Sequence, residues 1–93
     1  VLGVNDRVQL NQVEREYQRC LAEELMRRGV SIADVARVDI RGSLACGEDV
    51  SIDVNVVFEG DVRLGNGVSI GAHCVLSDVT IGDDSVIHPM SHI

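Results

Sequence analysis

The sequence predicts a mainly β protein, a parallel β-helix of hexapeptide repeats preceded by a long N-terminal α-helix. Two observations carry this prediction. An aliphatic or small apolar residue recurs at every sixth position from Ile40 onward, and a helical stripe of apolar residues lies upstream of that run. The recurring positions are Ile40, Cys46, Ile52, Phe58, Leu64, Ile70 and Leu76 and, after one step of five, Ile81, Ile87 and Ile93.

A period of six matches neither the 3.6 residues of a helix nor the two residues of an isolated strand. It is typical of a chain that forms a short strand, turns a corner and repeats, so that equivalent side chains point inward. Three such faces make one coil, which predicts that Phe58 stacks over Ile40 and Ile81 over Leu64. Repeats of this kind bury their apolar faces only against neighbouring repeats. A second inward register follows four positions after the first: Leu44, Val50, Val56, Val62, Val68, Cys74, Ser85 and Ser91.

The upstream stripe predicts one helix from about Arg7 to Arg28. Asp6 and Gln9 form a capping pattern at its start, and Gly29 is a natural stop. Because no other helix of comparable length is predicted, we expect this helix to pack on another domain or to act as a spacer. Its apolar positions follow a spacing of three and four, at Leu10, Val13, Tyr17, Leu21 and Leu25.

The segment from Val30 to Asp39 is predicted to cap the first coil, which would then begin at Ile40. Ser31 and Asp34 form a second capping pattern for one or two helical turns. Pro89 lacks a backbone N–H group and is expected at a corner.

Composition excludes several classes of function. A formal net charge of −7 argues against binding to nucleic acid or to an anionic membrane surface. No apolar run approaches the roughly 20 residues that span a bilayer, and the start does not resemble a signal peptide, so we expect a cytoplasmic protein. The three cysteines, Cys20, Cys46 and Cys74, form no CxxC pair and are expected to be reduced.

Three segments together resemble one family. They are Gly3-Val4-Asn5-Asp6-Arg7, then Ala36 to Gly42, which reads Ala-Arg-Val-Asp-Ile-Arg-Gly, and finally Ile52 to Gly60. This combination of a strand-end motif, a long helix and hexapeptides resembles the GlmU-type bifunctional N-acetylglucosamine-1-phosphate uridyltransferase / glucosamine-1-phosphate N-acetyltransferases, over essentially the whole chain. The resemblance implies that the β-helix is left-handed, an exception to the usual right-handed crossover.

The resemblance also implies how the chain is divided and what it serves. Residues 1–7 would end a uridyltransferase domain, 8–29 would form the linker helix, and 30–93 would be the first coils of a trimeric acetyltransferase domain. The parent enzyme would use Mg²⁺ for uridylyl transfer from UTP and acetyl-CoA for acetylation of glucosamine-1-phosphate. Asn5 alone carries over as a site residue, as a ligand of Mg²⁺ and a contact of UDP-N-acetylglucosamine; without the family motif it would be interpreted as a helix cap.

Other polar residues offer weaker candidates. His73, His88 and His92 could hold zinc, but His73 is predicted to stack on Met90 and not on another histidine. Cys74 falls in an inward register, which disfavours a nucleophile. A solvated face is the expected role of the acidic residues, Asp53, Asp61, Asp78, Asp83 and Asp84.

The chain starts without Met and stops with its period still running, so we expect a piece of a larger protein that by itself has no catalytic residue. Two alternatives remain open. The chain could be a non-catalytic trimeric scaffold, or a small acyltransferase of another specificity.

Overall fold

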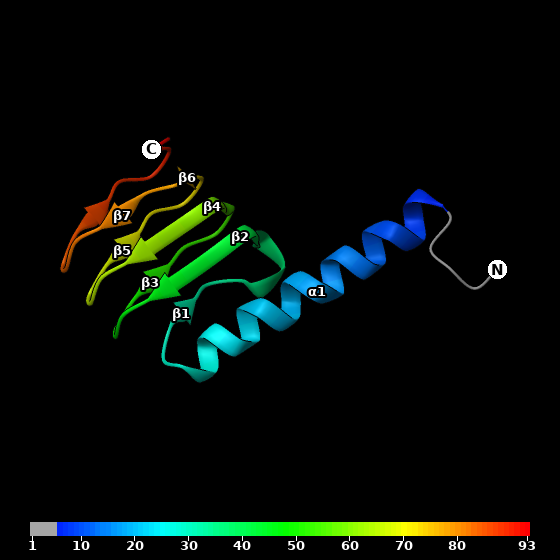
Figure 1. Cartoon of the computed structure of the whole chain (residues 1–93), viewed down its shortest axis with the longest axis horizontal. Helices are drawn as coiled ribbons and strands as arrows, with labels where there is room; N and C mark the ends of the chain where they lie inside the picture. The colour runs from blue at the N-terminus through cyan, green and yellow to red at the C-terminus, as the bar shows by residue number, and fades with distance from the viewer. Residues whose placement is uncertain (1–5) are drawn as a thin grey trace.

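The computed structural model describes residues 6–93 as a β-solenoid of about three coils with one helix at its N-terminal end (Figure 1). The predicted fold class is therefore confirmed. The elements in chain order are α1 Arg7–Arg27, β1 Ser31–Ile32, the 3₁₀-helix η1 Val35–Arg37, β2 Val38–Cys46, β3 Ser51–Ile52, β4 Val56–Leu64, β5 Ser69–Ile70, β6 Val75–Ser77, β7 Thr80–Ile81 and β8 Val86–Ile87.

All pairs between these strands are parallel, and they form two sheets. The first sheet has the order β1-β3-β5-β8, and the second the order β2-β4-β6. Strand β4 pairs with β6 through its first half and with β7 through its second half, so the second sheet covers two of the three faces.

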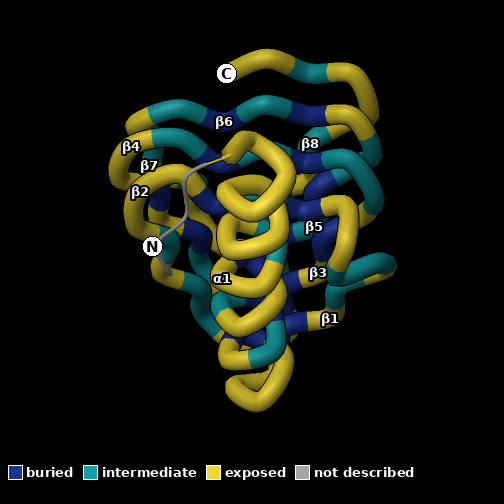
Figure 2. Tube along the Cα trace, turned by 90° about the vertical axis from the view of Figure 1, so that its right-hand side faces the viewer, coloured by how far each residue is buried: buried dark blue, intermediate teal, exposed yellow. Residues whose placement is uncertain are grey.

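The predicted stacking is confirmed. Ile40 lies opposite Phe58, and Phe58 lies opposite Leu76. The step of five places Ile81 opposite Leu64, as predicted. Because each coil repeats these positions, the inward side chains are shielded from water. Buried stretches of the trace recur from coil to coil (Figure 2). The most completely buried side chains are Phe58, Leu76, Val38, Val50, Val56, Val62, Val68 and Cys74.

The first coil begins earlier than the sequence predicted. Ser31–Ile32 is already strand β1 and pairs with β3. Ser31 was expected to cap a helix, but its N–H donates to the carbonyl of Val50 at 2.8 Å and is part of the sheet. Only Asp34 acts as a cap, accepting from the N–H of Ala36 at 3.0 Å. The segment from Val30 to Asp39 thus belongs to the first coil and does not close it.

The helix ends agree with the prediction. Asp6 accepts a hydrogen bond from the N–H of Gln9 at 2.8 Å, and Gly29 follows the helix with a φ of 99°. That φ lies in the left-handed region, which favours glycine.

The packing of α1 corrects one prediction. Its C-terminal half lies on the first coil, where Ala22 and Leu25 are buried, so the helix finds a partner within the chain. Its N-terminal end extends away from the coils (Figure 1), and the apolar side chains of Val8, Leu10, Val13 and Tyr17 are exposed. Within residues 6–93, no helix is both long and apolar enough to cross a membrane.

One corner of the solenoid leaves no room for a side chain. Gly60 has a φ of 68°, and a Cβ added there would lie 2.0 Å from Oδ1 of Asp78 in the next coil. Asp78 needs this approach, because the same oxygen accepts from the N–H of Asp61 at 2.9 Å. One carboxylate therefore joins two coils at this corner.

Gly60→Ala is predicted to lower the free energy of unfolding by about 1–3 kcal/mol, because it combines backbone strain with loss of the Asp78 contact. Gly82→Ala is the matched control: a Cβ there meets nothing within 4 Å, so we expect a change below about 0.5 kcal/mol. Denaturant titration measures both. Equal losses in the two variants would contradict this account of the corner.

Candidate functional site

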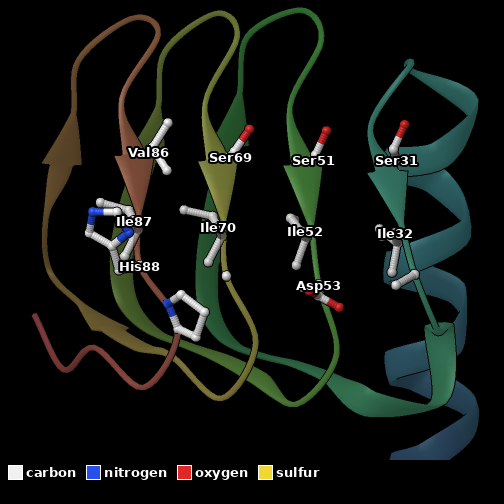
Figure 3. A pocket seen from close by; sticks show the side chains of 13 residues that line it. Ser31, Ile32, Ser51, Ile52, Asp53, Ser69, Ile70, Val86, Ile87 and His88 are labelled. Atoms are coloured by element: carbon white, nitrogen blue, oxygen red, sulfur yellow. The ribbon is translucent and has the colours of Figure 1, made fainter.

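The outer face of the first sheet is hollowed along β1, β3, β5 and β8, with a volume of about 550 Å³ (Figure 3). Ser31, Ser51 and Ser69 occupy the same position in successive coils, and Val86 continues the row. The isoleucine after each of these residues lies in the next row, and Ile52 and Ile70 are buried. The short strands thus present small side chains outward while their isoleucines fill the core.

Few groups on this face can perform chemistry. Asp53 accepts a hydrogen bond from the N–H of Val54 at 2.8 Å, which ties its carboxylate to the neighbouring backbone. Gly71 lies directly against Pro89, because a Cβ added to Gly71 would be 2.6 Å from the proline nitrogen. The face therefore carries no side chain at residue 71. Small side chains and low charge suit contact with another protein surface better than bond-making.

The second sheet, which covers the two other faces, is different, because charged side chains pair on both of them. Arg41 lies 3.4 Å from Asp39 and 3.7 Å from Glu59, and Arg63 lies 3.4 Å from Asp61. Exposed pairs of this kind contribute little stability, but burying them in an interface would cost desolvation energy. The face of the first sheet and the two faces of the second sheet therefore differ in how readily they can be covered.

The acidic corner residues have a structural role that the sequence analysis missed. Asp83 accepts from the N–H of Asn66 at 2.8 Å, and the Asn66 side chain in turn accepts from the N–H of Glu48 at 2.8 Å. With Asp78 they form short ladders of side-chain-to-backbone bonds that join successive coils. The signal was Asn66 and Asp83 at equivalent corner positions of successive coils, and Gly42 and Gly60 at the positions equivalent to Asp78. These side chains are used for folding, in addition to the solvation that was expected.

The histidines lie at or near corners. His73 and Met90 occupy the same corner in successive coils, with φ values of 60° and 67°, which confirms their predicted stacking. His88 belongs to the first-sheet face, and His92 forms a bridge with Val75. Among residues 6–93, no three His, Cys, Asp or Glu side chains gather as a metal site.

The two inward cysteines are placed as predicted. Cys74 is fully buried, and its thiol lies 3.2 Å from the carbonyl of His88. Cys46 packs against the core, and burial raises the pKa of its thiol to about 11. At neutral pH it is therefore protonated, which makes it a poor nucleophile. Cys20 is exposed on the helix.

Asn5, the one residue predicted to bind Mg²⁺ and the sugar nucleotide, lies outside the described residues. Among residues 6–93 no cluster of side chains offers a ligand set for Mg²⁺, so no step of a reaction can be derived from their geometry. What they provide is a stack of coils with one face of small side chains.

Comparison with known proteins supplies the remaining observation. A family model described as bacterial transferase hexapeptide (six repeats) matches residues 46–78. The bifunctional protein GlmU of Methylibium petroleiphilum is 59% identical over 93 residues, which is 100% of this chain and 20% of that protein. The bifunctional protein GlmU of Nitrosospira multiformis is 56% identical over 98% of this chain and 20% of its own length.

The resemblance to GlmU-type bifunctional proteins is confirmed. A third relative, the bifunctional protein GlmU of an Azoarcus species, is 55% identical over 99% of the chain. The chain spans about a fifth of the length of these curated relatives. Within its coils, residues 46–78 are similar to the hexapeptide repeats of bacterial transferases.

Proposed function

We propose that this chain is the arm and the first coils of a bifunctional transferase that makes UDP-N-acetylglucosamine. One domain would acetylate glucosamine-1-phosphate with acetyl-CoA, and the other would transfer a uridylyl group from UTP to the product. The observation that carries this proposal is identity of 54–59% to proteins named bifunctional GlmU along the whole chain. The product would supply precursors of peptidoglycan and lipopolysaccharide, and a reaction that uses UTP and acetyl-CoA would take place in the cytoplasm.

In this proposal the chain supports catalysis and performs none. Residues 1–7 end the uridyltransferase domain, 8–29 are the linker helix, and 30–93 begin the acetyltransferase solenoid. Asn5 would bind Mg²⁺ and the sugar nucleotide at the end of the first domain, since a neutral amide oxygen adds a hard ligand without adding charge beside phosphates. The roles of Asp78, Asp83 and Gln18 support a structural part for the coils, because their polar groups bond to the backbone.

We further propose that the protein assembles as a homotrimer through the outer face of the first sheet. That face carries the serine row, and the second sheet carries the paired charges. A surface of mostly small side chains, with Asp53 as its one carboxylate, can approach another subunit closely and loses little hydration in doing so. Small molecules and further copies of the chain are then its partners, rather than nucleic acid or membrane.

A non-catalytic trimeric scaffold is the second candidate, because the polar side chains of the coils serve folding. The two candidates differ in the intact protein, where only the first predicts transfer of both groups. An acyltransferase of another specificity would show acetyl transfer to a different acceptor and no uridylyl transfer.

Asn5→Ala in the intact protein is predicted to reduce uridylyl transfer at least about tenfold, because a metal ligand is lost. Acetyl transfer should be unchanged, since that reaction takes place in the other domain. Asn11→Ala, an exposed position on the helix, is the control and should affect neither. Failure of the wild-type protein to catalyse either transfer would overturn the proposed function.

Ser51→Arg places a cation in the middle of the first-sheet face and is predicted to dissociate the trimer. Ser43→Arg is the matched control: it makes the same change on the outer face of the second sheet, where Ser43 bonds to Asp61 at 3.1 Å and an arginine can pair with that carboxylate. Light scattering after size-exclusion chromatography reads the mass. Dissociation by Ser43→Arg alone would place the interface on the other face.

A further inference from the structure

The side chain of Gln18 is the one buried polar side chain among the described residues, with 3% exposure. Its Oε1 accepts from the N–H of Ile40 at 2.8 Å, and its Nε2 donates to the carbonyl of Ile40 at 3.0 Å. Nε2 also donates to the carboxylate of Glu14 at 2.8 Å. One amide therefore satisfies both backbone groups of a single strand residue.

Ile40 lies at the outer edge of the first coil. Strand β2 pairs with β4 on one side only, with Asp39 opposite Val57 and Ile40 opposite Phe58. The N–H of Val57 points toward the following coil, where it bonds to Cys74. Asp39 is the residue equivalent to Val57 in the first coil, so its backbone N–H points toward β4. The backbone groups of neighbouring residues in a parallel strand point to opposite sides, so those of Ile40 point away from β4.

A side-chain amide carries the same donor and acceptor as a peptide group. Gln18 thus occupies the place that a residue of a further strand would take beside β2. A second helix residue is held along the same edge. Arg15 pairs with Asp39 at 2.5 Å and donates to the carbonyl of Ala36 at 3.3 Å. The helix therefore bonds to the first coil at three residues, Ala36, Asp39 and Ile40.

We propose that α1 covers this edge of β2 and that Gln18 is the residue that prevents another strand from pairing there. An uncovered strand edge is a template for pairing with another chain. In a solenoid such pairing would join copies end to end, in addition to any contact between their lateral faces, and so would give larger assemblies. By covering the edge, α1 therefore restricts association of the chain to its lateral faces.

Gln18→Met tests the proposal in the full protein. Methionine has a similar length and is a good helix former, but it cannot make either bond to Ile40. We expect exchange of the Ile40 amide hydrogen to accelerate about tenfold or more, while the Phe58 amide one coil further stays protected. We also expect assemblies larger than those of the wild type, growing with protein concentration.

Gln12→Met is the matched control, because Gln12 is exposed on the same helix and should change neither measurement. If Gln18→Met also exposes the backbone amide of Phe58, the milder variant Gln18→Asn is used in its place. Asparagine keeps the side-chain amide but is too short to reach Ile40. Rapid exchange of the Ile40 amide without larger assemblies would overturn the proposal that α1 prevents association at this edge. An unchanged Ile40 amide would overturn the hydrogen-bonding role of Gln18.

Discussion

The structure depends on the stacking of one coil on the next. Each coil contributes short parallel strands whose backbone bonds run to its neighbours, as from the N–H of Ser51 to the carbonyl of Val68 or from the N–H of Asp53 to the carbonyl of Ile70. Each also contributes inward aliphatic side chains that are buried only because a similar side chain lies above or below. A single coil has neither, so the stability of such a fold comes from interfaces between neighbouring repeats. Corners must therefore match from coil to coil, which explains the close approach of the Gly60 and Asp78 corners.

The same dependence makes the first coil a special case. It has a neighbouring coil on one side, and the helix covers the other. The burial of Ala22 and Leu25 covers its apolar edge, and Gln18 satisfies its backbone at Ile40. The helix is thus both a covering for the coils and, through its exposed N-terminal half, a projection away from them. These two properties suit an arm that joins a solenoid to another domain.

The sequence predicted the solenoid well because its period is set by core packing, and the inward positions, including the step of five, follow from apolar spacing alone. The start of the first coil was missed because Ser31 pairs with Ser51, a wider spacing than that from Ile40 to Phe58, and this breaks the regular period. Gln18 was missed because a polar side chain beside an apolar stripe is usually solvated, and only the position of β2 shows that it is buried.

The candidate site was less predictable. The row of Ser31, Ser51 and Ser69 on the outer face was not predicted, because apolar spacing identifies only the inward residues. The recurrence of serine was nevertheless visible in the sequence. The role of the corner carboxylates could not be predicted without the path of the backbone, because Asp83 and Asp78 accept hydrogen bonds from N–H groups of another coil. Asn5 rests on the family resemblance alone, and it stays a prediction.

The central proposal is that this chain supports two transferase sites and contains neither in full, with Asn5 as its one contribution to the uridyltransferase site. The most direct measurement is an assay of the purified chain for uridylyl and acetyl transfer, beside the intact protein, with circular dichroism showing that the chain is folded. The account predicts both activities in the intact protein and neither in the folded chain. Transfer of either group by the chain alone, at a rate comparable to that of the intact protein, would contradict it.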